Sequence, residues 1–97
     1  MTIEVTVSGS AAELRLIGWL DTRTSPELGA ALEALMPDVS ALMLDMAQLE
    51  YISSAGLRQI LAAFNAMNGA VTLRHVSGEI LNVLRMTGLD KRLRIEP

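Results

Sequence analysis

Residues 41–61 read Ala-Leu-Met-Leu-Asp-Met-Ala-Gln-Leu-Glu-Tyr-Ile-Ser-Ser-Ala-Gly-Leu-Arg-Gln-Ile-Leu. Residues 41–44 are apolar without alternation, which is typical of a central strand buried on both faces. Residues 45–54 are expected to form the loop that follows this strand. Apolar residues then recur at the spacing of one helical face, at Leu57, Ile60, Leu61 and Phe64. A buried strand followed by an amphipathic helix predicts an α/β fold.

The residues before this segment predict a hairpin and a helix. Apolar residues alternate with polar ones over residues 3–7 and 13–16, and Gly9-Ser10 separates the two runs, as in a β-hairpin. Ser25 and Pro26 then have the types favoured at the N-cap and first position of a helix. Pro37-Asp38 is expected to end that helix.

The residues after it complete the expected order. A strand is predicted at 71–74, a third helix around 80–84 that is closed by Gly88, and a short last strand at 93–95. The result is a single domain over 1–97 with the order β-β-α-β-α-β-α-β, in which helices pack on a small mixed sheet. Functional sites gather where parallel strands end.

Three loops are therefore expected to meet at one pole of the sheet: residues 21–25, 45–54 and 75–78. Asp21 and Asp45 at that pole are compatible with Mg²⁺, although caps of loops or helices are the commoner role of such residues. His75, the one histidine, is expected there too. A Ser-His-Asp triad with Asp45 and Ser54 is thus conceivable, but the Gly-x-Ser-x-Gly elbow is missing and we expect no enzyme.

Composition narrows the class of protein. The chain has 97 residues, 51% of them hydrophobic, and a formal charge of −3. A mildly acidic domain is a poor candidate for direct nucleic-acid binding. The absence of cysteine excludes disulfides, thiolate zinc sites and cysteine nucleophiles. No apolar run approaches the ~18 residues of a membrane span, and no basic region followed by an apolar stretch opens the chain, so we expect a cytoplasmic protein without membrane insertion. No cofactor is expected.

Ser53 and Ser54 immediately precede the helix of residues 57–64. Serine is a favoured N-cap because its hydroxyl satisfies an unpaired backbone N–H. Alternatively, one of the two is phosphorylated. A phosphate adds about −1.5 to −2 charges at the positive end of the helix dipole, which the fold tolerates and a docked partner does not. Arg58, four residues beyond Ser54, is either a partner for that phosphate or a solvated side chain.

Two neighbours of the serines also have two interpretations. Gly56, one turn into the helix, allows the close approach of another backbone or of a partner side chain. The alternative is that it packs against the sheet. Tyr51 is either an exposed anchor for a partner or a core residue with its hydroxyl at the edge.

The pattern of residues 42–61 resembles the signature of STAS domains, and is most similar to that of bacterial anti-sigma-factor antagonists. Gly18-Trp19-Leu20-Asp21 is similar to the Gly-x-Leu-Asp that ends the second strand in that family. Residues 80–89 resemble its third helix with a Gly-Leu stop. The common motif of the family is Asp-Ser-Ser-Gly-Leu or Asp-Ser-Thr-Gly-Leu, so Ser53 stands here in place of the Asp and Ala55 follows the phosphorylated position.

This resemblance implies a protein that sequesters an anti-sigma factor, which is also a serine kinase of the GHKL ATPase type, and thereby frees a sigma factor. Phosphorylation ends the binding, and a PP2C-type phosphatase restores it. By position the phosphorylated residue is Ser54, with Ser53 as second choice. The partner surface that the resemblance implies comprises Asp21, Thr22, Tyr51, Ser53, Ser54, Gly56, Leu57 and Arg58.

A non-switching STAS subunit is the alternative, such as an accessory subunit of a lipid-trafficking ABC transporter. Relatives of that kind resemble Asp-Thr-Ala-Gly-Leu at this site. The chain shares Ala55-Gly56-Leu57 with them, whereas Ser54 and Arg58 favour the sigma-regulatory branch.

Overall fold

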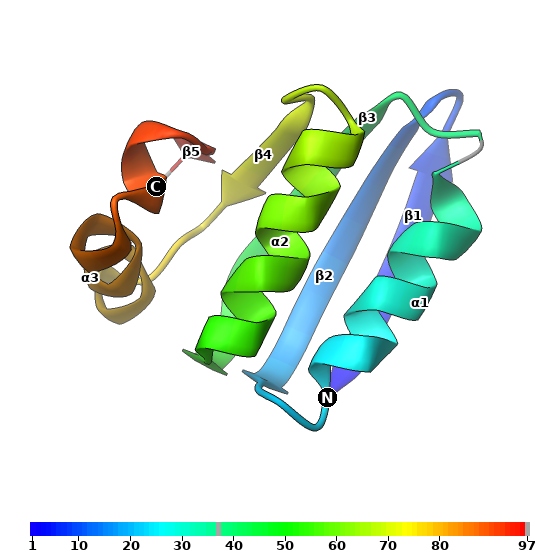
Figure 1. Cartoon of the computed structure of the whole chain (residues 1–97). Helices are drawn as coiled ribbons and strands as arrows, with labels where there is room; N and C mark the ends of the chain where they lie inside the picture. The colour runs from blue at the N-terminus through cyan, green and yellow to red at the C-terminus, as the bar shows by residue number, and fades with distance from the viewer. Residues whose placement is uncertain (37, 97) are drawn as a thin grey trace.

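The computed structural model describes residues 1–36 and 38–96 (Figure 1). Within these residues it contains five strands, three α-helices and one short 3-10 helix. In chain order they are β1 Thr2–Ser8, β2 Ala11–Leu20, α1 Ser25–Leu35, β3 Ala41–Ile52, α2 Ser54–Ala66, β4 Val71–Arg74, α3 Gly78–Thr87, η1 Leu89–Lys91 and β5 Arg94–Glu96.

The five strands form one mixed sheet in the order β1-β2-β3-β4-β5. β1 and β2 are the antiparallel hairpin, and every later pair is parallel. Each parallel pair is joined by a helical crossover, as α/β connections require. The predicted fold class and element order are thereby confirmed.

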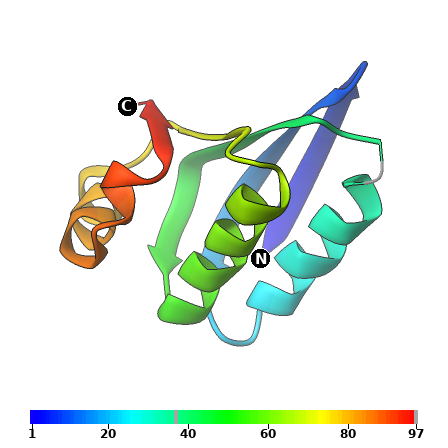
Figure 2. The same ribbon diagram turned by 45° about the horizontal axis from the view of Figure 1, so that its top comes forward.

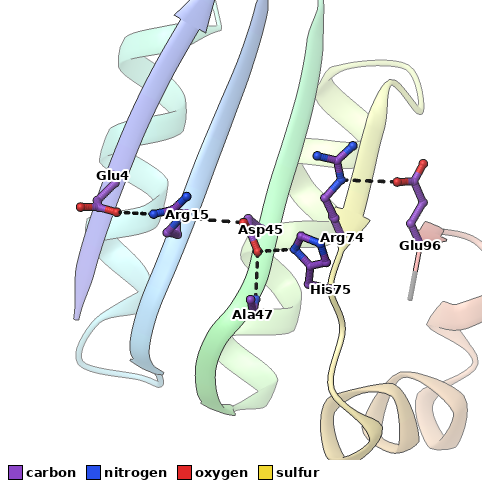
Figure 3. A network of polar contacts seen from close by, with 7 residues as sticks. All are labelled: Glu4, Arg15, Asp45, Ala47, Arg74, His75 and Glu96. Carbon is purple, nitrogen blue, oxygen red and sulfur yellow. Dashed lines mark hydrogen bonds and ion pairs between the residues drawn. The ribbon is translucent and has the colours of Figure 1, made fainter.

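The helices α1 and α2 lie side by side on one face of the sheet in both views (Figures 1 and 2). Alternate strand residues point toward them, and Leu14, Leu16 and Leu44 are fully buried. Leu28 of α1 and Ile60 of α2 meet these residues in the core. The opposite face of the sheet is open and carries the polar side chains of Figure 3.

β3 has 12 residues, and the expectation of a loop from residue 45 onward was wrong. The strand continues because it pairs with β2 as far as the contact between Ile52 and Leu20, and both side chains are buried. Its pairing with β2 shifts register twice. Such irregularities break the two-residue alternation by which a strand is recognised in sequence.

The start of α1 also differs from the expectation. The N-cap is Thr24 rather than Ser25, which is the first helical residue and is buried. The Ser25 hydroxyl donates to the carbonyl oxygen of Asp21. The Thr24 hydroxyl donates to the carbonyl of Trp19 at 2.7 Å, so neither hydroxyl caps the helix in the usual way. Pro37, which was expected to help end this helix, lies outside the described residues.

Candidate functional site

The carboxyl ends of β2 and β3 lie next to each other, so the loops that follow these strands meet as expected. Leu20 and Ile52 are paired in register, and the Ser53 amide donates to the Leu20 carbonyl at 2.9 Å. Asp21 begins the loop to α1, and Ser53 immediately precedes α2. Both segments are therefore anchored to the same end of the sheet.

The third loop does not join them. β4 ends at Arg74, whose register partner on β3 is Asp45. Asp45 is seven residues before Ile52 in the strand, which at the rise of an extended chain is roughly 20 Å. His75 therefore sits beside Asp45 and far from Ser54. The expectation that Asp45 and His75 share a pole with the serines was wrong, because β3 extends beyond β4.

The two serines occupy different positions at the start of α2. Ser53 is the N-cap, with extended backbone, and its side-chain oxygen accepts a hydrogen bond from the Gly56 amide at 3.3 Å. Ser54 is the first residue of the helix and is exposed. The structure thus assigns capping to Ser53 and leaves the Ser54 hydroxyl at the surface, next to the positive end of the helix dipole.

Gly56 and Leu57 are buried beneath this surface. A Cβ at Gly56 would be 2.7 Å from Cγ of Leu20 and 3.0 Å from the Leu20 carbonyl oxygen. Of the two interpretations of Gly56, close packing against the sheet is therefore the one that the structure shows. Gly56 and Leu57 pack the first turn of α2 against the sheet, and this packing positions Ser53 and Ser54.

Asp21 organises the loop between β2 and α1. Its Oδ1 accepts hydrogen bonds from the amides of Arg23 at 2.9 Å and Thr24 at 3.1 Å. The hydrogen bond from the Thr24 amide is the main cause that lowers the pKa of Asp21 below 3.8, against a smaller opposing effect of desolvation. Asp21 is thus a charged loop residue at pH 7, and the adjacent Thr22 is exposed.

The exposed Trp19 stacks near Tyr51 on the open face of the sheet at this end. The ring centroids are 5.0 Å apart and the ring planes are inclined by 35°. The two residues are paired in register, and both side chains are exposed, at 55% and 45%. Tyr51 was expected in the partner surface, whereas Trp19 was not among the predicted site residues. Its alternation with the buried Leu16 and Leu20 was the available signal, because it puts Trp19 on the opposite face.

We call the accessible part of this region the β2–β3 pole. Its members are side chains that are at least partly exposed at or next to the carboxyl ends of β2 and β3: Trp19, Asp21, Thr22, Tyr51, Ser54 and Arg58. Arg58 lies one helical turn beyond Ser54 on α2, so the two side chains project from the same side of the helix.

A second polar cluster crosses the middle of the open face (Figure 3). The Asp45 carboxylate lies 3.1 Å from His75 Nδ1 and 3.8 Å from Arg15 Nε, and accepts the Ala47 amide at 3.0 Å. Arg15 in turn contacts Glu4 at 3.3 Å. Desolvation of Asp45 raises its pKa, but the combined hydrogen bonds and positive charges outweigh this effect and the pKa is lowered below 3.8. Asp45 and His75 were expected to lie close together, whereas the participation of Arg15 and Glu4 was not predicted.

Among residues 1–36 and 38–96, no group of three or more His, Asp or Glu side chains is arranged to hold a metal ion. In the same part of the chain, no helix is both long and apolar enough to cross a bilayer.

The family model described as "Mlab, STAS domain" matches residues 3–96. Because this match covers nearly the whole chain, the protein belongs to the STAS domain family. No curated protein matches the sequence.

Solved structures share the fold at low sequence identity. An anti-sigma factor antagonist from Mycobacterium paratuberculosis has 24% identity and a TM-score of 0.89, over 99% of this chain and 85% of that one. The Bacillus cell fate determinant SpoIIAA in its phosphorylated form has 17% identity and a TM-score of 0.76, over 97% and 90%. A sulfate transporter family protein from Wolinella succinogenes has 15% identity and a TM-score of 0.78, over 94% and 80%. The fold is thus found in proteins with different described roles.

Proposed function

We propose that this protein is an anti-sigma-factor antagonist whose binding is switched by phosphorylation of Ser54. The observation that carries the proposal is the division of roles between the two serines. Ser53 caps α2, whereas Ser54 presents an exposed hydroxyl at the first position of the same helix. The similarity to structures of antagonists, one of them phosphorylated, supports this proposal.

The position suits a switch because the fold and a partner respond differently to a phosphate. The start of a helix favours negative charge through its dipole and its free N–H groups. Arg58, one turn further on, is placed to approach the phosphate. A partner docked on the same spot has to accommodate about −1.5 to −2 additional charges. Phosphorylation therefore alters binding and leaves the fold intact.

In this proposal the partner is an anti-sigma factor that is also a serine kinase of the GHKL ATPase type. The unphosphorylated antagonist binds this kinase through the β2–β3 pole and frees the sigma factor. A PP2C-type phosphatase returns the antagonist to its binding form. The protein acts in the cytoplasm by binding and not by catalysis.

The decisive experiment uses a GHKL-type kinase that co-purifies with the unphosphorylated chain from its own cells, and the absence of such a kinase from the purified complex contradicts the proposal. Incubation with this kinase and ATP is expected to place one phosphate on Ser54, located by peptide mass spectrometry. Ser54→Asp is expected to bind the kinase about tenfold to a thousandfold more weakly, equivalent to about 1.4 to 4 kcal/mol. Ser54→Ala should bind like the natural protein and accept no phosphate. Equal affinity for Ser54→Asp and the natural protein contradicts the switch.

The second candidate is a non-switching STAS subunit, such as the accessory subunit of a lipid-trafficking ABC transporter. Ala55 after the exposed serine favours it, as does the matching family model, which is described as "Mlab, STAS domain". In this case the chain purified from its own cells remains unmodified and bound to transporter subunits in every growth condition. Ser54→Asp should then leave that assembly intact.

A further inference from the structure

The outer edge of β1 is unprotected. β1 is the first strand of the sheet and pairs only with β2, so no strand of the described residues covers its other side. Its register with β2 is continuous from Thr2 to Ser8, without a bulge. Neither proline nor lysine occurs in the strand, and its one charged residue, Glu4, contacts Arg15 of the neighbouring β2 at 3.3 Å. Natural sheets usually guard an exposed edge with at least one of these devices, and an unguarded edge can pair with another chain.

The geometry of the hairpin shows which backbone groups are free. A two-residue turn, Gly9-Ser10, joins Ser8 to Ala11, and such a turn closes on a hydrogen-bonded pair. Because hydrogen-bonded pairs alternate along an antiparallel ladder, the N–H and C=O groups of residues 8, 6, 4 and 2 point toward β2. The corresponding groups of residues 3, 5 and 7 point outward.

Two of the three side chains at the outward-directed positions are also about half exposed. Val5 and Val7 are 46% and 53% exposed, although they lie on the same face of the sheet as the buried Leu14 and Ala12 with which they pair. Two neighbouring valines are therefore left in water next to an open backbone edge. Association that covers both removes apolar surface and satisfies the free backbone groups together.

We propose that β1 pairs antiparallel with β1 of a second copy of this chain, about a two-fold axis at Val5. The sequence around Val5 is nearly symmetric, with Ile3 and Val7, Glu4 and Thr6, and Thr2 and Ser8 at equal distances. The axis places Val5 opposite its own copy and Ile3 opposite Val7 of the second copy. Every pairing then uses only the outward N–H and C=O groups, and the two sheets become one.

The charges of β1 fit this arrangement. Glu4 is the only charged residue in the strand, and it lies opposite Thr6 of the second copy. With this axis, no two like charges lie directly opposite each other across the dimer. The Thr6 hydroxyl of one copy can donate a hydrogen bond to the Glu4 carboxylate of the other. A seven-residue edge is small against the roughly 1,200–2,000 Å² of a stable interface, so the dimer is weak and forms reversibly at high concentration.

The first test measures mass and amide exchange together. Sedimentation equilibrium from about 10 μM to 1 mM is expected to show a rise from monomer to dimer, as for a weak interface. The amides of Ile3, Val5 and Val7 should gain protection from hydrogen exchange over the same range. The Thr2, Glu4, Thr6 and Ser8 amides should be protected at every concentration. A chain that remains monomeric at 1 mM, or a dimer that protects other amides, overturns the proposal.

Two variants test the register. A lysine opposes edge pairing where it meets no opposite charge, but Thr6→Lys places it opposite Glu4 of the second copy, so two equivalent pairs should tighten the dimer about 2- to 30-fold. Gln48→Lys adds the same charge at an exposed position on β3 and should leave the dimer unchanged. Val5→Pro removes an outward N–H that makes no bond within the chain, so it should abolish the dimer at unchanged circular dichroism. Equal dissociation constants for Thr6→Lys and Gln48→Lys contradict the proposed axis, whatever the folding of Val5→Pro.

Discussion

Gly56 and Leu20 approach so closely that no methyl group fits between them: a Cβ at position 56 would lie 2.7 Å from Leu20 Cγ. The Leu20 carbonyl oxygen also accepts a hydrogen bond from the Ser53 amide. The end of β2 thus determines where α2 begins, and with it the position of the exposed Ser54.

Gly56→Ala is therefore expected to destabilise the protein by about 1–3 kcal/mol, since an overpacked core costs this much. The better helix propensity of alanine contributes up to about 1 kcal/mol in the opposite sense and does not offset the clash. Gly78→Ala is the matched control, because Gly78 also lies in a first helical turn and a Cβ there meets no atom within 4 Å. Urea unfolding compares the two, and equal stabilities of the variants contradict the steric explanation.

Ser53 and Ser54 should contribute differently to the free energy of unfolding, because only Ser53 caps the helix. Ser53→Ala removes the cap on the Gly56 amide and should cost about 1 kcal/mol in the free energy of unfolding. Ser54→Ala should stay within about 0.5 kcal/mol of the natural protein, as for an ordinary surface position. Ser53→Asp should retain full stability, because aspartate caps a helix as well as serine does. If Ser54→Ala is the more damaging alanine variant, the assignment of the cap is wrong.

Asp45 should make the protein sensitive to acid. Its folded pKa is lowered below 3.8, so its contribution to stability is present above pH 3.8 and is lost as the pH falls through the folded pKa. Asp45→Asn should destabilise the protein by about 1–3 kcal/mol at pH 7, because His75 and Arg15 lose a charged partner. The difference should shrink as the pH falls below 3.8 and through the folded pKa of Asp45. Asp21 acts in the same direction, so part of the acid sensitivity should remain in the variant.

Thermal unfolding of the natural protein and Asp45→Asn between pH 2 and pH 7 measures this difference. Glu4→Gln is the matched control, since it removes one carboxylate from the same open face but at an exposed position. A stability difference between Asp45→Asn and the natural protein that is constant with pH shows that the charge of Asp45 is not the cause.

Trp19 should report on the β2–β3 pole. It is the only tryptophan of the chain, and its exposed ring stacks near Tyr51. Binding of the proposed kinase should shift its emission to shorter wavelength, as the ring leaves water. Trp19→Ala should weaken that binding by at least about 2 kcal/mol if the ring is a hot spot. Val7→Ala, which truncates an exposed apolar side chain on another strand, should not weaken that binding. Unchanged emission on binding contradicts contact at this pole.

Much of the fold could be predicted from local pattern. Hydrophobic periods marked the hairpin and the helices, and the two serines just before the second amphipathic helix identified the region that carries the candidate site. These features depend on neighbours in the chain, because burial of one face repeats every two residues in a strand and every three to four in a helix.

The features of the fold and of the candidate site that local pattern did not predict depend on contacts between distant segments. β3 continues past Asp45 because β2 supplies hydrogen bonds to it, and two register shifts hide its alternation. His75 and Asp45 lie far from Ser54 because β4 ends at Arg74, opposite Asp45, whereas β3 runs on to Ile52. The sequence placed two serines at one helix start, and the backbone of the folded chain assigned the cap to Ser53. Each of these outcomes depends on where a second segment lies, which local periodicity does not encode.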